Sequence, residues 1–476
     1  MILASEMKTE NTQPSFRDRL YTIDESGKRL WVFAKKPKGP LTTWRTVAGI
    51  VLLVFFFAAP FIKVHGEQFL LFDFLNRKFV IFGIQFWPQD FNLFFIAMIA
   101  MIVFIILFTA TYGRIWCGWA CPQTVFMEII FRRVEYWIEG DVRKQKELDA
   151  MPWNGTRIFK KTLKQIVFYL ISFIIGNLFL VYLIGSDAWF RLITDKPAGH
   201  IVGLIIMLVF SFVFYFIFSW FREQVCTIVC PYGRLQGVLL DPATVVISYD
   251  YKRGEERGLL RKSENRKETE KGDCIDCRQC VNVCPTGIDI RNGTQLECIN
   301  CACCIDACNE MMKNVGFRPG LICYSSEKMI AEGKPWKFTL RSAAYTLVLA
   351  ALLAAFSFFL IGRNPLEATV MRSPGTLFQD MGNGKIANLY DIKVVNKTSN
   401  DFPVEIRVLS QKGEVKIIGR DPLIRKQTVG EAVFFIILDS KDIPEGKMEL
   451  KVGIFSGGKL LDETRATFFG PEKQRR

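Results

Sequence analysis

The sequence predicts a membrane α-helical bundle of five spans, an inserted bacterial dicluster ferredoxin-like domain and a C-terminal all-β Ig-like sandwich. Five apolar stretches are long enough to cross the roughly 30 Å hydrocarbon layer, which takes about 20 residues. Eight Cys stand in two regular runs, and the C-terminal part of the chain alternates apolar and polar side chains. The expected segments are 1–43, 44–235 with four spans, 236–339 with the Cys runs, 340–361 as the fifth span, and 362–476 as the sandwich.

Composition supports a membrane portion joined to water-soluble portions. Half of the 476 residues are hydrophobic and 23% are charged. The net charge of +14 does not indicate nucleic-acid binding, because the basic residues are scattered along loops beside apolar runs. All 14 Cys lie between Cys117 and Cys323. Their Cys-x-x-Cys spacings favour metal or redox chemistry in a reducing compartment over a disulfide framework.

Lys and Arg predict the orientation of the spans, because short loops rich in these residues stay in the cytoplasm. Residues 1–45 hold nine Lys or Arg and residues 113–164 hold ten, whereas residues 186–199 hold two. We therefore expect the N-terminus and the Cys-rich domain to be cytoplasmic and the C-terminal domain to lie outside. The expected spans are 44–62, 91–112, 165–185, 200–221 and 340–361.

Two connecting segments have a mixed character. Residues 67–88 are apolar but interrupted by Asp73, Asn76, Arg77 and Lys78, so an interfacial hairpin on the outer face is favoured over a sixth span. Residues 252–272 are dense in both charge signs. They are expected to form an exposed link without buried side chains.

The tail after Arg363 has the period-two alternation that is typical of a small antiparallel β-sandwich. Gly, Asn, Asp and Pro separate the stretches. The expected strands are 391–397, 403–410, 414–419, 432–438, 448–456 and 464–470.

Two Cys-x2-Cys-x2-Cys-x3-Cys runs carry the clearest chemical signal, in CIDCRQCVNVCP and CINCACCIDAC. In the bacterial two-cluster pattern, the fourth Cys of each run binds the other [4Fe-4S] cluster. The predicted ligands are Cys274, Cys277, Cys280 and Cys308 for the first cluster, and Cys298, Cys301, Cys304 and Cys284 for the second. Structural zinc sites are disfavoured, because they take two close Cys and then a gap. Two adjacent clusters predict an electron relay.

The residues after the fourth Cys of each run differ. Pro285 and Gly287 fit the turn that follows the first run, whereas Asn309 stands where Pro is usual after the second. This difference loosens a turn but removes no ligand.

A second set of four Cys forms an internal repeat, WCGWACP after span two and VCTIVCP after span four. We expect each Cys-x3-Cys pair to place both thiols on one face of a helix, with the following Pro at a turn or kink. Both spans leave the membrane on the same side, so the thiols should converge near the cytoplasmic interface. Such a set favours a soft metal such as Cu(I) or an additional iron-sulfur centre, and the alternative is plain helix packing. The four residues are Cys117, Cys121, Cys226 and Cys230.

The other potential metal ligands are expected to be structural. Two Cys lie outside both patterns and should be buried spectators, two His at the outer ends of spans favour interfacial packing over a bis-His haem, and three Met favour core packing over Cu(I) binding. These residues are Cys303, Cys323, His65, His200, Met311, Met312 and Met329.

In their order along the chain, the paired Cys-x3-Cys-Pro motifs, the tandem ferredoxin runs, the fifth span and the sandwich resemble the CcoG/FixG/RdxA family. These are the cytochrome c oxidase accessory proteins of cbb3-type oxidases. The resemblance covers nearly the whole chain, from about Tyr21 onward. It implies a multi-pass protein of the bacterial inner membrane, with a periplasmic C-terminal domain, that reduces Cu(II) to Cu(I) for assembly of a copper-haem oxidase. It also implies that the Cys-x3-Cys-Pro thiols, Cys117, Cys121, Cys226 and Cys230, handle the copper.

The expected partners are the lipid bilayer, a cytoplasmic electron donor and, by resemblance, oxidase assembly factors or copper chaperones. A homodimer is one possible assembly, and no nucleic acid is expected. The donor should be external, because no Gly-x-Gly-x-x-Gly fingerprint follows a strand. Two other functions stay open. One is an electron-transfer subunit that feeds a quinone or another reductase, and the other is a redox-sensing structural assembly factor.

Overall fold

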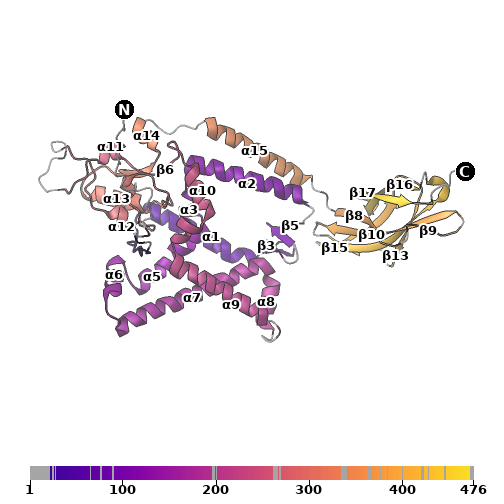
Figure 1. Ribbon diagram of the computed structural model, residues 1–476, viewed down its shortest axis with the longest axis horizontal. Helices are drawn as coiled ribbons and strands as arrows, with labels where there is room; N and C mark the ends of the chain where they lie inside the picture. Colours follow the sequence, from indigo (N-terminus) through magenta and orange to yellow (C-terminus); the bar gives the residue numbers. More distant parts are fainter. Residues whose placement is uncertain are drawn as a thin grey trace, which may run out of the picture. The chain divides into compact units, whose positions relative to one another are not determined.

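The computed structural model describes residues 22–471 apart from short gaps (Figure 1). His65, His200, Asn76 and Arg77 lie outside the described residues. The chain divides into two compact units, unit 1 with residues 1–62 and 95–353 and unit 2 with residues 63–94 and 354–476. The gaps are 24–25, 27, 65, 75–77, 88–89, 196–198, 200, 261–265, 267–269, 334–339, 363, 365, 376, 383, 399, 420–422, 427 and 444–445.

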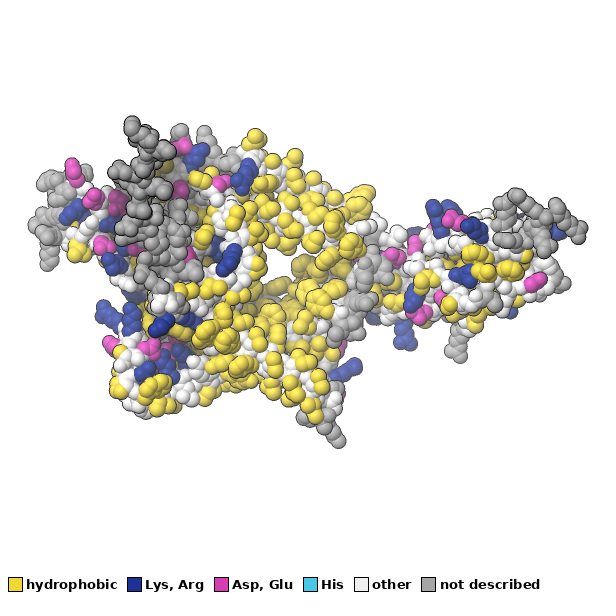
Figure 2. Space-filling model, viewed as in Figure 1, with side chains coloured by type: hydrophobic (Ala, Val, Ile, Leu, Met, Phe, Trp, Pro, Cys, Tyr) yellow, Lys and Arg dark blue, Asp and Glu magenta, His cyan; other side chains and the backbone are white. Residues whose placement is uncertain are grey.

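Five helices among the described residues are long and apolar enough to cross a membrane, as the sequence predicts. Their bounds are α1 (Pro40–Ala58, extended by the 3₁₀ turn η1, Ala59–Phe61), α2 (Phe91–Tyr112), α7 (Gly155–Ile184), α9 (Ile201–Phe216, extended by the π-helical turn η5, Ile217–Phe221) and α15 (Leu340–Ile361). Hydrophobic side chains cover their outer surfaces (Figure 2), which suits contact with lipid. The chain is a multi-pass membrane protein.

The helix α7 begins ten residues before the stretch that hydropathy predicts. Asn154 is its N-cap, and its side-chain oxygen accepts a hydrogen bond from the backbone N–H of Arg157 at 2.9 Å. The basic first turns are paired as well, since Lys161 and Lys164 contact Glu139 at 3.1 and 2.9 Å. Hydropathy locates the apolar part of a helix, whereas capping and ion pairs decide where the helix starts.

Short helical segments follow spans two, three and four in unit 1. Two of them are π-helical turns, which occur often at functional sites. The segments are α3 (Ile115–Trp119), α4 (Pro122–Val125), the π-helix η3 (Phe126–Phe131), α5 (Arg132–Ile138), α6 (Val142–Ala150), α8 (Ser186–Thr194), the π-helix η6 (Val225–Val229) and α10 (Pro231–Leu239).

The Cys-rich domain is built around a two-stranded antiparallel sheet in which β6 (Val246–Tyr249) pairs with β7 (Ile322–Ser325). Its core combines Cys thiols with apolar side chains such as Ile247, Val283 and Met312. The domain's helical segments are α11 (Tyr251–Gly254), α12 (Gln279–Asn282), the 3₁₀ turn η7 (Ile290–Asn292), α13 (Cys303–Asn314) and α14 (Glu327–Glu332).

The prediction that 252–272 contains no buried side chain is wrong at Arg266. This residue is 8% exposed, and its guanidinium donates to the carbonyl oxygens of Gly258, Gly272 and Cys274. A dense run of charges favours exposure only where water is the sole hydrogen-bond partner of the charged groups. Backbone carbonyls replace that water here, so the link is bound to the start of the first Cys run.

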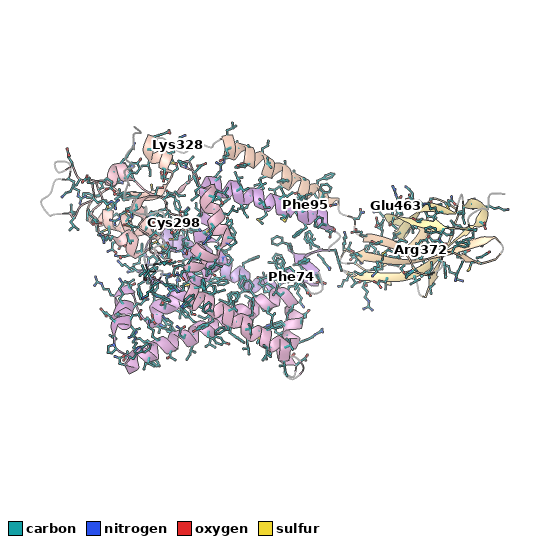
Figure 3. The ribbon with its side chains drawn as sticks, viewed as in Figure 1. Phe74, Phe95, Cys298, Lys328, Arg372 and Glu463 are labelled. Carbon is teal, nitrogen blue, oxygen red and sulfur yellow. The ribbon has the colours of Figure 1, made fainter. Side chains whose placement is uncertain are left out.

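Unit 2 contains the predicted β-sandwich. One sheet has the order β13-β15-β10-β8, with β9 also paired to β10, and the other has the order β12-β16-β17. A shared core includes Tyr390, Phe434 and Phe468, and Figure 3 labels Arg372 on β8 and Glu463 on β17. The strands are β8 (Leu366–Arg372), β9 (Gln379–Asp380), β10 (Lys385–Asn396), β11 (Phe402–Pro403), β12 (Glu405–Val408), β13 (Glu414–Ile418), β14 (Leu423–Ile424), β15 (Val429–Asp439), β16 (Lys447–Ser456) and β17 (Lys459–Phe469), and the 3₁₀ turn η8 spans Ser440–Asp442.

The segment after span one also belongs to unit 2. Its described residues form strands, as expected of a hairpin, and none of them belongs to a further span. Lys397 of the sandwich contacts Asp90 at 2.7 Å and Glu367 at 2.6 Å, which links this segment to the β-domain. The strands are β1 (Lys63–Val64), β2 (Glu67–Gln68), β3 (Leu70–Asp73), β4 (Lys78–Ile81) and β5 (Ile84–Phe86).

Candidate iron-sulfur and thiol site

The loops of the two Cys runs share an unusual backbone conformation. Asp276 and Arg278 in the first run have φ of 48° and 52°, and Asn300 and Ala302 in the second have 54° and 65°. Left-handed residues other than Gly are uncommon, and such loops direct successive backbone N–H groups into one concavity. Concavities of this kind bind anions, including iron-sulfur clusters.

The Cys of the predicted first cluster are neighbours. Burial raises the pKa of Cys308 to about 12, and the nearby thiols of Cys277 and Cys274 add to the shift. The pKa of Cys280 is raised to about 12, again mainly by burial, with Cys308 and Cys277 among the contributors. The fourth Cys of the second run therefore lies beside the first three Cys of the first run.

The Cys of the predicted second cluster line one internal cavity. Its walls include Cys284, Cys298, Cys301 and Cys304, together with Cys280 of the first set and several apolar residues. Figure 3 labels Cys298 within the Cys-rich domain. The donor set, the apolar walls and the left-handed backbone of the two loops fit a thiolate-bound [4Fe-4S] cluster. The assignment of individual ligands stays a prediction.

The second run continues directly into α13, and Asn309 explains why no Pro is needed there. Asn309 lies inside this helix, and its side-chain oxygen accepts a hydrogen bond from the N–H of Gly320 at 2.8 Å. The side chain thus fixes the chain that returns toward β7. A Pro at this position would break the helical hydrogen bonding.

The expectation that each Cys-x3-Cys pair lies on one helix face is wrong. Cys117 is in α3 and Cys226 is in η6, but Cys121 and Cys230 are extended N-cap residues of the next helices, α4 and α10. The following Pro is the reason, because it disfavours helical dihedrals in the residue before it.

The two segments nevertheless repeat one local geometry. The N–H of Cys121 donates to the carbonyl of Trp116 at 2.9 Å, and the N–H of Cys230 donates to the carbonyl of Val225 at 2.8 Å. Both bonds reach five residues back, and both precede a helix with Pro at its first position. The internal repeat of the sequence is therefore a repeat of structure.

The four thiols of these segments share one neighbourhood. Burial raises the pKa of Cys117, and Cys121 and Cys230 contribute to the shift. Burial also raises the pKa of Cys226 to about 12, with contributions from the other three thiols. Within the described part of the chain, however, no three His, Cys, Asp or Glu side chains are grouped to hold a single metal ion.

Gln236 of α10 connects the two segments. Its side-chain oxygen accepts hydrogen bonds from Cys117 Sγ at 3.1 Å and from Arg114 Nε at 3.2 Å. Arg114 also donates to the carbonyl of Leu296, just before the second Cys run. The end of span two, the helix α10 and the loop before the second Cys run are thereby held together.

The first Cys-x3-Cys segment packs against the loop of the second run. A Cβ atom on Gly118 would lie 2.9 Å from both the Cα and the backbone N of Cys301. Trp119 Nε1 donates to the Tyr324 hydroxyl at 3.1 Å, and this hydroxyl donates to the carbonyl of Asn300 at 3.0 Å. These contacts place Cys117 and Cys121 next to the predicted second cluster.

A buried charge network holds the helix ends around this site. Arg222, immediately before the second Cys-x3-Cys segment, contacts both carboxylate oxygens of Glu135 at 3.0 and 2.9 Å. Glu223 contacts Arg29 at 3.1 Å, and Arg132 contacts Glu128 at 3.0 Å. Removing Glu135 would leave Arg222 with only Glu223, 3.6 Å away, to compensate its buried charge.

The remaining candidates divide as follows. Cys303 is 1% exposed and accepts a hydrogen bond from the Arg45 guanidinium at 3.3 Å, whereas Cys323 lies partly exposed in β7. Met312 is buried in the core of the Cys-rich domain, and Met329 Sδ lies 3.9 Å from the Ser325 hydroxyl.

Sequence analysis did not identify Gly118, Gln236 or Arg45. A Gly between two Cys could have indicated a close backbone approach. Arg45 is an ionisable residue inside an apolar span, a feature that marks functional positions by default. Gln236 has no signal in the sequence alone.

Comparisons with known families match three parts of the chain. A 4Fe-4S dicluster domain matches residues 221–327, and a 4Fe-4S binding domain matches residues 94–145. An Ig-like fold found at the C-terminus of FixG matches residues 356–471.

Curated relatives extend over most of the chain. Protein RdxB of Cereibacter sphaeroides is 35% identical over 81% of this chain and 83% of its own, and protein RdxA of the same organism is 36% identical over 73% and 74%. The nitrogen fixation protein FixG of Rhizobium meliloti is 33% identical over 80% and 79%.

Proposed function

The chain belongs to the FixG/RdxA family and is an iron-sulfur electron-transfer protein, and from that premise we propose that it reduces Cu(II) to Cu(I) for a copper-haem oxidase. The proposed site of reduction is the set of four thiols at the ends of spans two and four. Electrons enter from an external cytoplasmic donor.

One observation carries this proposal: the first Cys-x3-Cys segment lies against the loop of the second cluster run, with Gly118 packed on the backbone of Cys301. A set of soft thiols thus stands next to an electron carrier. No such contact would be needed if the thiols served only helix packing.

The chemistry follows from ligand softness. Thiolates bind Cu(I) more favourably than harder ligands do, so a thiol set stabilises the product of the one-electron step. Each Cu(II) takes up one electron, and the bound thiols release protons as they ligate the ion. A bound [4Fe-4S] cluster is a one-electron donor and would supply that electron.

The thiols as they stand do not form a closed mononuclear site. The Pro residues after Cys121 and Cys230 and the π-helical turn η6 place these thiols at helix junctions, which adjust more easily than a helix interior. We propose that Cu(II) draws the four thiols together as it binds. Such a site also releases its ion, as a copper-delivery protein must.

The test is a double substitution, Cys226→Ser with Cys230→Ser, in protein purified without oxygen. Cu(II) reduction is followed with a Cu(I)-specific chelator, and iron is quantified in the same sample. The matched control is Cys323→Ser, a Cys outside both patterns. Loss of reduction in the double variant with iron retained supports the proposal, and unchanged reduction overturns it.

A second candidate for the four thiols is a third [4Fe-4S] cluster. The 4Fe-4S binding domain that matches residues 94–145 contains Cys117 and Cys121 but none of the eight Cys of the ferredoxin runs. A cluster also binds its four Cys through four different irons, so it needs no tight mononuclear group. Iron content separates the two, since about eight atoms per chain are expected from two clusters and about twelve from three.

The setting of this function is the bacterial inner membrane. We propose that the N-terminus and the Cys-rich domain face the cytoplasm and that the β-sandwich faces the periplasm, on the basis of the Lys and Arg distribution. The proposed partners are oxidase assembly factors or copper chaperones that accept Cu(I), with a homodimer as one possible assembly. Tagging both ends for protease accessibility in spheroplasts tests the orientation.

A further inference from the structure

Arg45 is a buried cation in the first turns of span one. Its side chain is 6% exposed. Nε donates to the carbonyl of Gly118 at 2.8 Å, and Nη1 donates to the Sγ of Cys303 at 3.3 Å. The guanidinium thus bridges the first Cys-x3-Cys segment and the loop of the second cluster run.

The start of span one is fixed to the same loop by Asp306. The carboxylate accepts hydrogen bonds from the N–H of Thr42 at 2.7 Å and from its hydroxyl at 2.8 Å, and from the N–H of Leu41 at 3.3 Å. Asp306 belongs to α13, which begins at Cys303. Asp306 thus accepts hydrogen bonds from the N-terminal turn of α1, although it belongs to a different helix. This fixes the position of Arg45 beside the second run.

Among the described residues, no carboxylate lies within ion-pair distance of Arg45, and the negative charge of Glu128 acts on it only at longer range. The two contacts of Arg45 are a carbonyl and a thiol, and Glu128, which lines the same pocket, is engaged by Arg132 at 3.0 Å. A buried charge is costly unless an opposite charge compensates it. A [4Fe-4S] cluster with four thiolates carries net negative charge, and reduction adds one more.

The first run has a different electrostatic setting. Arg291, near Cys280, is engaged by two carboxylates, with Asp289 at 2.6 Å and Asp276 as its second partner. Arg266 contacts the backbone carbonyl of Cys274 rather than a thiol. The charge of Arg291 acts on Cys280, but its two carboxylate partners offset that charge, whereas Arg45 has no carboxylate within ion-pair distance.

We propose that Arg45 is a counter-charge of the second cluster and raises its reduction potential, which draws the electron to the cluster beside the Cys-x3-Cys thiols. Net charge and hydrogen bonding near the sulfurs are among the factors that set cluster potentials. A fixed cation favours the reduced form, because that form carries the larger negative charge. The electron moves only between the two clusters, so no further reagent is needed.

This inference rests on cluster binding and not on copper reduction, so potentials measured without copper test it alone. The experiment is an EPR-monitored redox titration of the full-length protein in detergent, with iron quantified. Arg45→Gln removes the charge, Arg45→Lys keeps it, and Arg133→Gln is the matched control. Arg133 lines the same pocket, but it is exposed and contacts Thr46.

We expect Arg45→Gln to make reduction of one cluster about tenfold less favourable, a fall of about 59 mV for one electron, and to leave the other cluster unchanged. Arg45→Lys should recover most of the loss, and Arg133→Gln should have no effect. Unchanged potentials in Arg45→Gln at full iron content overturn the inference, as do equal shifts in both clusters. If Arg45→Gln does not retain its iron, the cluster potentials of Arg45→Lys are compared with those of the unchanged protein. A tenfold change in cluster reduction in this charge-conserving variant overturns the inference.

Discussion

Gly118 and Cys301 lie backbone against backbone, with the position of a Gly118 Cβ atom 2.9 Å from the Cys301 backbone N. Such a distance leaves no room for any side chain. The Gly between the two Cys of the first Cys-x3-Cys segment therefore brings that segment onto the loop of the second run. This contact joins the cluster domain to the thiols at the membrane.

Gly118→Ala should separate the two loops. We expect a loss of stability of about 1–3 kcal/mol from overpacking and slower Cu(II) reduction, with iron content retained. Thermal unfolding and the chelator assay measure the two effects. Gly155→Ala is the matched control, because a Cβ there meets nothing within 4 Å. Equal reduction rates in both variants would show that the contact has no part in the reaction.

Cys284→Ser should remove the second cluster and leave the first. The reason is that Cys284 lines the cavity with Cys298, Cys301 and Cys304. Iron should fall from about eight to about four atoms per chain. The remaining EPR signal should be insensitive to Arg45→Gln, whereas the signal left in Cys308→Ser should respond to it. The opposite pattern would mean that each run binds its own cluster with all four Cys.

The lowered pKa of Glu135 predicts how the free energy of unfolding depends on pH. Burial alone would raise the pKa of this carboxyl, but Arg222 and Lys164 outweigh burial and lower it from 4.5 to about 2. Because the folded-state pKa lies below the unfolded one, this stabilisation is complete above about pH 4.5 and is lost as the pH falls toward 2. Unfolding temperatures measured in detergent across this range should show the decline.

Glu135→Gln should remove part of that acid dependence and destabilise the protein at neutral pH by about 3–5 kcal/mol, because Arg222 keeps only the more distant Glu223, at 3.6 Å, as a carboxylate partner. Glu449→Gln on the exposed face of β16 is the control. Parallel pH profiles for Glu135→Gln and the unchanged protein would rule out Glu135 as the source.

Phe434→Ala should destabilise the β-sandwich without affecting redox chemistry. Phe434 is fully buried, and its ring stacks on Tyr390 with centroids 5.7 Å apart. Loss of a buried Phe costs about 3–5 kcal/mol. Limited proteolysis should cleave the C-terminal region faster, while iron content and Cu(II) reduction stay as they were. Loss of iron in this variant would contradict a division into separate compact units.

The sequence predicts the elements whose signal is local. Apolar length gives the five spans, period-two alternation gives most of the sandwich strands, and Cys spacing gives the runs. Strands β8, β9 and β14 were not anticipated, and two of them are only two residues long.

Features that depend on distant partners could not be predicted. Arg266 is predicted to be an exposed charge until the carbonyls around it are known. The helix breaks at Cys121 and Cys230 are a different case, because the Pro residues directly after them are a local signal that predicts the breaks. The contact of Gly118 with Cys301 joins segments far apart in the chain, so no local pattern encodes it. Arg45 is different, because a charge within an apolar span already marks a position worth testing.

The most direct test of the account is a stoichiometric titration. Full-length protein is reduced, freed of reductant without oxygen and mixed with Cu(II), and cluster absorbance and Cu(I) are followed together. In the unchanged protein, we expect about two Cu(I) per chain as both clusters are reoxidised. In the Cys226→Ser, Cys230→Ser double variant, we expect no fast reoxidation of the clusters by copper. Equally fast and complete Cu(I) formation in the double variant with intact clusters would contradict the account.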